Sequence, residues 1–304
     1  MLGDVSSRKP ATMVLAMAFL VAACGGEPSG APAPASPEGS IGALKSGAAE
    51  LSLLQAQSAL TTGGALFTFG LVSSQGDLAS GGSPQVWVAR DETSPALGPF
   101  AATYHRFSEE FADSAPRGAP GFYVADVDIP SPGNWAVAAV ADDGSGRAVA
   151  SGFMTVVAES VAQVGTRALA VKTPVGETEA ERRLICTREP PDPMHYISLD
   201  AALESGKPTV VNFGTPLLCE SRMCGPVVDE LLLVFNEVGA ERANFIHVEV
   251  YPDRDQRNPA PEFLAWGFGS EPWTVVIDRE GIIRAAFEGP VVAAQIHQAL
   301  DPLL

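Results

Sequence analysis

The sequence predicts two folded domains of different classes, an all-β sandwich followed by an α/β domain. Its 304 residues allow two domains, because a domain usually contains about 100–200 residues. In the first half, short alternating stretches of apolar and polar residues lie between turns rich in Gly, Pro and Asp, which is typical of β-strands. In the second half, strand patterns alternate with helical patterns, which favours a central sheet covered by helices.

The charge of the chain is strongly negative, with 36 acidic side chains against 19 basic ones. The basic residues form no cluster beyond the pairs at 8–9 and 182–183. Binding to nucleic acid requires a basic surface that neutralises phosphates. We therefore expect no nucleic acid among the partners.

Residues 1–24 have the features of an export signal. A basic pair at 8–9 precedes an uncharged apolar run at 11–23, which is too short to span a membrane comfortably. The end of the run, Leu-Val-Ala-Ala-Cys at 20–24, resembles the lipobox of bacterial lipoproteins. This resemblance implies lipidation of Cys24 and anchoring in the bacterial cell envelope, facing the periplasm or the exterior. If the host has two membranes, the outer one is favoured, because Gly25 is not the aspartate that resembles an inner-membrane retention signal. The alternative is an ordinary signal peptide or signal anchor in which the cysteine is incidental.

Residues 25–50 are rich in Pro, Ala and Gly. They contain too little apolar surface to fold, and their prolines favour semi-extended backbone. We expect this segment to be a tether that gives the protein reach from the membrane.

Residues 60–158 are expected to form the β domain. The predicted strands are at 65–72, 85–89, 122–129, 134–140 and 148–157. Their regular spacing between turns favours a sandwich. The run from Gly121 to Trp135 also resembles immunoglobulin-like domains of bacterial envelope proteins, and this resemblance implies an immunoglobulin-like sandwich with Trp135 in its core.

Residues 159–194 are predicted to be a connector, since they include a Pro-rich stretch at 190–193 that cannot form regular structure. Cys186 lies in this connector. Apart from Cys24, the chain has three cysteines, Cys186, Cys219 and Cys224. Because this number is odd, one cysteine is expected to be free, paired with another molecule, or used transiently.

Residues 195–304 are expected to form the α/β domain, organised around the stretch 207–238. A β-branched run at 209–213 predicts a buried strand, and apolar residues spaced by three and four at 227–238 predict a helix. Pro226 suits the first turn of this helix. Cys224 would then lie at or just before the helix N-terminus, where free N–H groups and the helix dipole favour a thiolate.

The motifs of this domain resemble those of thioredoxin-fold proteins. Cys224-Gly225-Pro226 matches the first three residues of the Cys-Gly-Pro-Cys motif of thioredoxins, and the segment 271–278 resembles the one that carries their cis-proline. The resemblance implies a thioredoxin-like domain over 195–304, with Pro272 facing the active-site sulfur. The chain departs from the family at Val227, which replaces the second cysteine, so Cys219 is the expected partner sulfur. It also has Asn212 where many thioredoxins keep a buried acid.

Three functions remain open from the sequence. In the first, the protein is an extracytoplasmic thiol–disulfide exchange protein that acts on thiols or disulfides of envelope proteins, with Cys224 attacking, Cys219 resolving and Pro272 positioning the partner. In the second, it is a non-enzymatic interaction or scaffold lipoprotein with a structural Cys219–Cys224 disulfide. In the third, it binds or delivers copper through both sulfurs and His247 or His195, since thiolates and imidazole suit Cu(I). No cofactor is expected apart from this copper alternative.

Overall fold

The computed structural model describes residues 38–111, 120–142, 146–219, 221–254 and 258–304. The expected export signal, Cys24 and the first half of the expected tether lie outside the described residues. The second half of the expected tether is folded, since residues 41–45 form a helix and a strand begins at Ala49. Among the helices of the described part, none is long and apolar enough to cross a membrane.

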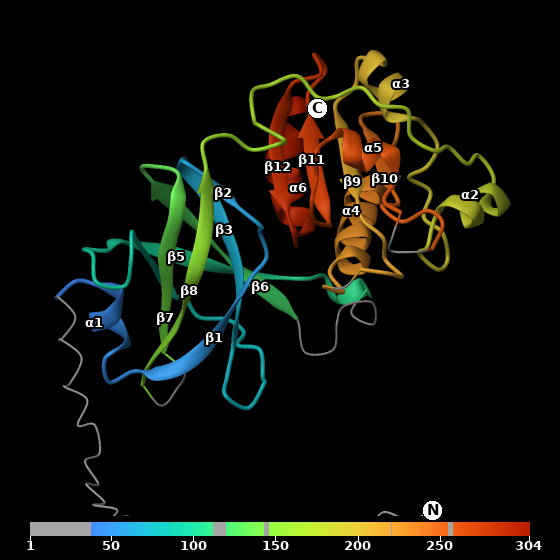
Figure 1. Cartoon of the computed structure of the whole chain (residues 1–304). Helices are drawn as coiled ribbons and strands as arrows, with labels where there is room; N and C mark the ends of the chain where they lie inside the picture. Colours follow the sequence, from blue (N-terminus) through green and yellow to red (C-terminus); the bar gives the residue numbers. More distant parts are fainter. Residues whose placement is uncertain (1–37, 112–119, 143–145, 220, 255–257) are drawn as a thin grey trace, which may run out of the picture. The chain divides into compact units, whose positions relative to one another are not determined.

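The N-terminal region is built almost entirely of β-strands (Figure 1). Its elements are α1 (Ile41–Lys45), β1 (Ala49–Gln55), β2 (Leu60–Thr61), β3 (Gly63–Val72), β4 (Gln85–Ala89), β5 (Leu97–Arg106), the 3₁₀ turn η1 (Glu109–Phe111), β6 (Gly121–Ile129), β7 (Gly133–Asp142) and β8 (Arg147–Val157). The predicted all-β character is confirmed. The strands β1 and β5 were not predicted. Most of their residues are partly or fully exposed, β5 shows no alternation of apolar and polar side chains, and β1 begins inside the segment that was expected to be a tether.

The strands of this region form one continuous hydrogen-bonded ladder in the order β1-β3-β6-β5-β4-β7-β8-β2. The ladder closes like a barrel because β1 also pairs in parallel with β8. Two strands make this closure possible by changing neighbours along their length. β1 pairs with β8 through 49–51 and with β3 through 52–55, and β5 pairs with β4 through 97–101 and with β6 through 102–106. The sequence predicted a sandwich of two separate sheets. In the structure the two layers are joined, because β1 and β5 each pair with a strand of one layer and then with a strand of the other.

Trp135 lies in the core of this region, as predicted. Its side chain is 4% exposed and packs in the cluster that includes Phe67, Phe69 and Tyr123. The indole N–H donates to the carbonyl oxygen of Ser131 at 2.9 Å, so the polar end of the buried ring is satisfied.

The C-terminal region contains a four-stranded sheet in the order β10-β9-β11-β12. Its elements are α2 (Glu179–Ile185), α3 (Leu199–Glu204), β9 (Thr209–Phe213), α4 (Cys224–Val238), β10 (Asn244–Val248), α5 (Pro261–Ala265), β11 (Trp273–Ile277), β12 (Ile283–Glu288), α6 (Ala293–Leu300) and the 3₁₀ turn η2 (Asp301–Leu303). β9 is parallel to β10 and antiparallel to β11. The predicted strand at 209–213 and the predicted helix after it are confirmed.

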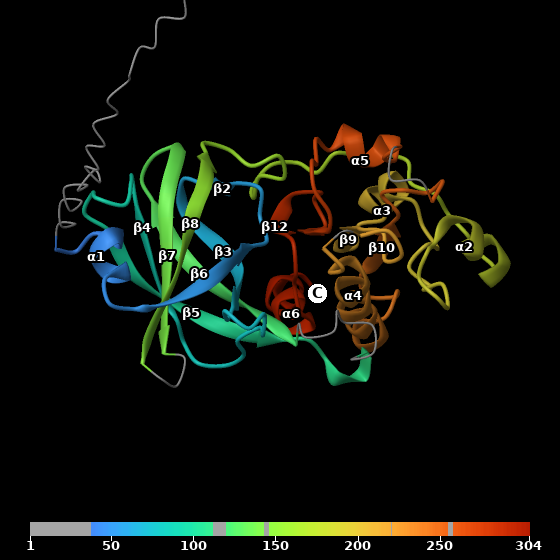
Figure 2. The ribbon, with the colours of Figure 1, turned by 60° about the horizontal axis from the view of Figure 1, so that its bottom comes forward.

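Helices cover both faces of this sheet (Figure 2). Val210 of β9 packs with residues of α4 and α6, whereas the next residue, Val211, packs with residues of α3 and α5 on the opposite face. This alternation follows from the two-residue period of a strand. The topology, with two helix-covered faces, is the thioredoxin-like arrangement that the resemblance implied.

The segment between the two regions packs more tightly than the sequence indicated. Ala162 and Ala168 are buried in the core on the α3 side of the sheet, and the N–H of Gly165 donates to the carbonyl oxygen of Ile283. The stretch 186–195 also folds against the C-terminal region, because the N–H of His247 donates to the carbonyl oxygen of Met194. Residues of this segment therefore contribute to the interior of the α/β region.

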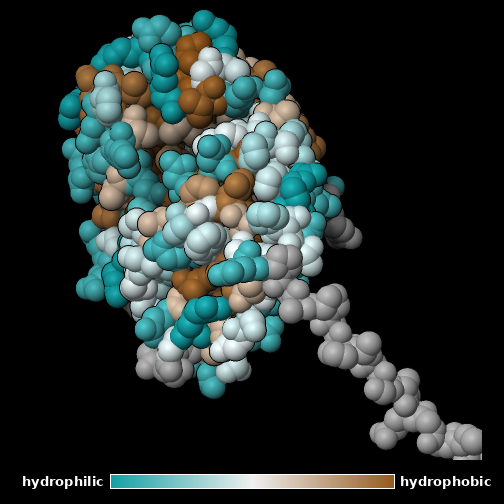
Figure 3. Space-filling model, turned by 90° about the vertical axis from the view of Figure 1, so that its left-hand side faces the viewer, coloured by the Kyte–Doolittle hydropathy of each residue, from teal (hydrophilic) through white to brown (hydrophobic). Residues whose placement is uncertain are grey.

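The surface is largely polar. Figure 3 shows one face of the molecule, on which hydrophilic residues predominate and hydrophobic residues form separate patches. Such scattered exposed apolar residues are normal for a surface in contact with water.

Candidate functional site

A disulfide joins Cys219 and Cys224 at the N-terminus of α4. Cys224 is the first residue of the helix, and Cys219 lies in the loop that leads from β9 to it. This loop turns sharply because the N–H groups of Leu218 and Cys219 both donate to the carbonyl oxygen of Thr215. The two Cα atoms are 5.9 Å apart, a usual separation for a disulfide.

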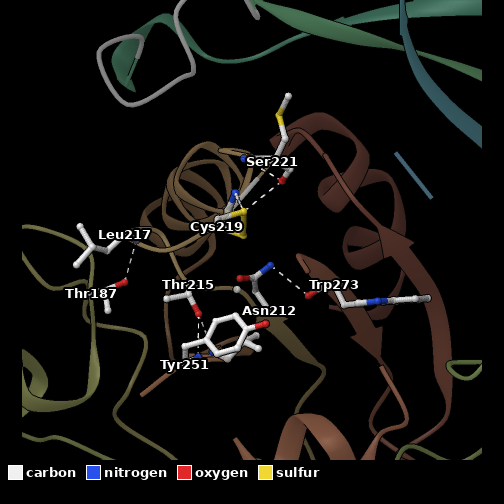
Figure 4. Close-up of a disulfide and its surroundings, with 12 residues drawn as sticks. Thr187, Asn212, Thr215, Leu217, Cys219, Ser221, Tyr251 and Trp273 are labelled. Carbon is white, nitrogen blue, oxygen red and sulfur yellow. Dashed lines mark hydrogen bonds between the residues drawn. A yellow bond between two sulfur atoms is a disulfide. The ribbon is translucent and has the colours of Figure 1, made fainter. Parts of the chain in front are cut away.

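Both cysteines of the disulfide are buried, to different extents. Cys224 is completely buried, whereas Cys219 has 8% of its surface exposed. The backbone N–H of Cys224 donates to Sγ of Cys219 at 3.3 Å, and the hydroxyl of Ser221 lies 3.2 Å from the same sulfur (Figure 4). Hydrogen bonds of this kind stabilise a thiolate when the disulfide is reduced. Both contacts are made to Cys219, whereas the sequence predicted Cys224 as the attacking sulfur.

Pro272 lies beside the disulfide, as the resemblance implied. The Glu271–Pro272 peptide bond is cis. A Cβ atom added to Gly214 would lie 3.3 Å from Cβ of Cys224 and 3.4 Å from Cβ of Pro272. Gly214 thus fills the narrow space between the sulfur-bearing helix and the proline, and a larger residue there would displace one of them.

Asn212 connects two strands beneath the site. Its amide donates to the carbonyl oxygen of Trp273 at 3.1 Å and to Oγ1 of Thr274 at 2.9 Å (Figure 4). A neutral amide cannot take up or release a proton near pH 7. The role that a buried acid has in many thioredoxins must therefore belong to another residue, if it exists in this chain.

Glu271 supplies a carboxyl group beside the disulfide. One of its oxygens and the two sulfurs lie within 4.8 Å of one another. Burial raises the pKa of Glu271 to about 7, although hydrogen bonds from Thr215 act in the opposite direction. Sequence reasoning missed this residue. Its position directly before the expected cis-proline was the available signal.

A second group of side chains, the Cys186 cluster, consists of Cys186, Asp192, His195 and His247. Nδ1 of His247 is 2.8 Å from Oδ2 of Asp192, and the thiol of Cys186 donates to the same oxygen at 3.3 Å. All four residues are at most 3% exposed. Burial by itself would raise the pKa of Asp192 and lower that of His247, but their ion pair reverses both directions, so that the pKa of Asp192 is well below and that of His247 well above the usual value.

The structure separates the residues of the expected copper site. His247 and His195 belong to the Cys186 cluster, whereas the potential ligand atom that lies near the sulfurs of Cys219 and Cys224 is a carboxylate oxygen of Glu271. Nε2 of His247 is 3.0 Å from the carbonyl oxygen of Gly214, so this nitrogen is not directed at the two sulfurs. Copper binding by Cys219, Cys224 and His247 remains a prediction that this arrangement does not favour.

Comparisons with known proteins give only remote similarities. No protein-family model matches the sequence, and no curated protein matches it. Among solved structures, a secreted thiol-disulfide isomerase from Corynebacterium glutamicum is 18% identical, with a TM-score of 0.29 over 35% of this chain and 75% of that chain. A thiol:disulfide interchange protein of the thioredoxin family from Chlorobium tepidum is 18% identical, with a TM-score of 0.29 over 45% of this chain and 99% of that chain. A DsbF homologue from Corynebacterium diphtheriae is 21% identical, with a TM-score of 0.28 over 35% of this chain and 77% of that chain. These scores are too low to decide what this chain does.

Proposed function

We propose that the C-terminal region exchanges thiols and disulfides with other proteins through Cys219. The observation that carries the proposal is the position of the Cys219 sulfur. It is the partly exposed member of the Cys219–Cys224 disulfide, and it accepts a hydrogen bond from the first N–H of α4. A sulfur in this position is open to attack and is a stable leaving group as a thiolate.

The exchange proceeds in two steps when a partner dithiol is oxidised. A partner thiolate attacks Sγ of Cys219, a bond forms between these sulfurs, and the electron pair of the Cys219–Cys224 bond passes to Sγ of Cys224. The second partner thiolate then attacks the partner sulfur of the mixed disulfide, and Cys219 leaves as a thiolate. The partner loses two electrons and the Cys219–Cys224 pair gains them, and the reverse sequence reduces a partner disulfide.

Glu271 provides the proton for the first step. Its carboxyl group is close to both sulfurs, and with a pKa of about 7 it is partly protonated at neutral pH. It transfers this proton to the thiolate that forms on the buried Cys224, because an uncompensated charge there would be costly. Pro272, which lies beside Cys224, positions the backbone of the partner.

The proposal places this chemistry in the envelope of a bacterium, outside the cytoplasm, with the protein held by lipid on Cys24. The lipobox-like sequence at 20–24 supports this location, and so does the disulfide, since disulfides persist in oxidising compartments. The N-terminal β region would be an immunoglobulin-like domain, which the strands that change neighbours and the buried Trp135 support. The proposed domains extend beyond the limits expected from the sequence, 60–158 and 195–304, because β1 pairs with β3 and β8 and because Ala162 and Ala168 pack in the core of the α/β region.

Paired trapping experiments test the assignment of the sulfurs. In the full chain with Cys224→Ser, Cys219 has no resolving partner, so a mixed disulfide with an added substrate protein is expected to accumulate on a non-reducing gel. Cys219→Ser is the matched control. It should trap at least about tenfold less complex, because Cys224 is buried. Equal trapping by both variants would contradict the assignment, and no trapping by either would favour the structural disulfide.

The reduction potential of the pair distinguishes exchange from a structural role independently of any partner. We expect a value above about −200 mV, the range of a labile exchanging disulfide. A value below about −300 mV is typical of a structural disulfide and would favour the scaffold function. Equilibration of the full chain with glutathione or dithiothreitol buffers, followed by alkylation of free thiols, gives this potential.

A further inference from the structure

The Cys186 cluster contains the donor atoms of a tetrahedral metal site. It offers one sulfur, two imidazole nitrogens and one carboxylate oxygen, all within 4.8 Å of one another. Zn²⁺ binds these three atom types, and its structural sites have four protein ligands and no open position. The cluster matches such a site both in its number of ligands and in its burial.

Most distances within the cluster resemble the edges of a coordination tetrahedron. The exception is the 2.8 Å between Nδ1 of His247 and Oδ2 of Asp192, which is a hydrogen-bond distance and would have to lengthen. With bonds of about 2.0–2.3 Å to zinc, neighbouring ligand atoms are about 3.3–3.8 Å apart. Sγ of Cys186 is 3.3 Å from Oδ2 of Asp192 and 3.9 Å from Nδ1 of His247. Nε2 of His195 is 3.6 Å from Oδ2 of Asp192. Small side-chain movements would therefore bring these atoms to ligand distances.

Two of the ligands are oriented by hydrogen bonds from their other polar atom. Nε2 of His247 lies 3.0 Å from the carbonyl oxygen of Gly214. A carbonyl only accepts, so this nitrogen carries a proton. Nδ1, which donates to Oδ2 of Asp192 in the ion pair, would offer its lone pair to a metal ion after losing that proton. Oδ1 of Asp192 accepts from the N–H of Met194 at 2.9 Å, which leaves Oδ2 for the cluster. Metal-binding histidines and carboxylates are commonly fixed in this way.

His195 gives a second, independent indication of a ligand. Its side chain is 1% exposed, and Nε2 lies 3.6 Å from Oδ2 of Asp192, an ion-pair distance that is too long for a hydrogen bond. A buried polar atom without a partner is costly. A metal ion would satisfy it.

The charges of the cluster also fit a divalent ion. As ligands, the Cys186 thiolate and the Asp192 carboxylate carry two negative charges, and the histidines are neutral. One divalent cation leaves the buried site without net charge. Without a cation, the interior must hold a buried ion pair, which is stabilised only when its geometry is very good.

We propose that Cys186, Asp192, His195 and His247 bind one Zn²⁺ ion in a closed structural site. The ion joins the stretch 186–195 to β10, which lies far from it in the sequence. Through the bond from His247 to Gly214, it also supports the loop that begins the disulfide site. This inference is independent of the proposed thiol–disulfide exchange.

Cobalt substitution tests the site in the full chain with its Cys219–Cys224 disulfide kept oxidised. After treatment with a chelator, Co²⁺ is titrated into the protein. We expect a thiolate-to-cobalt charge-transfer band and the visible bands of tetrahedral cobalt. Both should saturate at one ion per chain and disappear when one equivalent of Zn²⁺ is added.

Matched variants locate the site. Cys186→Ser should lose the charge-transfer band, and His195→Ala should keep the band but bind cobalt at least about tenfold more weakly, as expected on loss of a ligand. The double variant Cys219→Ser/Cys224→Ser should retain both the band and the affinity. His297→Ala should also retain them, because His297 forms an exposed pair with Glu237 and Asp301.

The proposal is overturned if the wild-type chain gives no such band at one equivalent of cobalt. It is also overturned if the band survives in Cys186→Ser or is lost in the Cys219/Cys224 double variant. A second measurement uses only the wild-type chain, so its result does not depend on whether the variants fold correctly. In moderate urea, Zn²⁺ should slow alkylation of Cys186 in the wild-type chain by at least about tenfold, and equal rates with Zn²⁺ and with chelator would contradict zinc binding at Cys186.

Discussion

The disulfide site and the Cys186 cluster both contact Gly214, yet they differ in access and in chemistry. Around the disulfide, one sulfur is partly exposed and the nearby carboxyl of Glu271 has a pKa of about 7. In the Cys186 cluster, every donor is buried, and an imidazole and a carboxylate form a close pair. The partial exposure of Cys219 and a carboxyl group that can give up a proton near pH 7 suit exchange with a partner. The burial of the Cys186 cluster and its four potential ligand atoms suit a permanent structural role. The difference shows that the surroundings of a cysteine decide its chemistry.

The largest effect on stability is expected from Asp192→Asn. This change removes the charge that faces His247 and one proposed ligand, and loss of one partner from a buried pair costs about 3–5 kcal/mol. Urea unfolding of the full chain measures the free energy of unfolding. The matched control is Glu92→Gln, which breaks an exposed pair with Lys45 and should cost at most about 1 kcal/mol.

A chelator sharpens this prediction. It should destabilise the wild-type chain but leave the Asp192→Asn variant almost unchanged, since the variant no longer holds the ion. Equal destabilisation of both proteins would mean that the chelator acts elsewhere.

Removal of the disulfide by Cys219→Ser/Cys224→Ser should affect activity more than stability, in contrast to Asp192→Asn. It is expected to abolish exchange with a substrate disulfide but to cost only about 2 kcal/mol of stability, because the closed loop is short, with a sequence separation of 5. Exchange assays and urea unfolding of the same preparation check both parts. If exchange persists, Cys186 would be the reactive thiol, and the contrast between the two groups would be wrong.

Glu271→Gln should change how stability depends on pH. The pKa of Glu271 is raised to about 7 in the folded protein, from the ordinary value of 4.5, so the folded state holds this proton more tightly than the unfolded state. Stability from this group is therefore complete at low pH and is lost as the pH rises from about 4.5 through 7, by about 1–3 kcal/mol. The free energy of unfolding of the Glu271→Gln variant should not show this decrease between pH 4.5 and 7. Urea unfolding of both proteins at pH 5 and pH 8 provides the test.

The same variant tests the proposed proton transfer. The ratio of wild-type to Glu271→Gln rates for reduction of the disulfide by dithiothreitol should be greatest below pH 7 and approach one above pH 8. A ratio that does not change with pH would remove Glu271 from the mechanism, even if the stability prediction holds.

The smallest effect is expected from Ser221→Ala. The hydroxyl lies 3.2 Å from Sγ of Cys219, and loss of a hydrogen bond to a thiolate costs about 1–2 kcal/mol. Alkylation of the reduced Cys219 at neutral pH should therefore slow by about tenfold, because a smaller fraction of it is thiolate. The rate is measured in a Cys224→Ser background, with Ser94→Ala as a surface control. An unchanged rate would mean that the helix N–H alone stabilises the thiolate.

The sequence by itself determined the local elements of this protein. The β-branched run at 209–213 and the apolar spacing at 227–238 gave the strand and the helix, and the Pro272 segment gave the proline beside the sulfur. These features depend on neighbouring residues, whose propensities and periodicity are visible in a single sequence.

Only the tertiary structure decided which side chains from distant parts of the sequence contact one another. Cys186 and His247 are 61 residues apart in the sequence and contact each other because the stretch 186–195 packs on β10. The exposure of Cys219, the burial that raises the pKa of Glu271, and the closure of the β ladder through β1 also arise from long-range packing. Burial and contact between distant segments depend on the whole fold, so the position of a residue in the sequence cannot specify them.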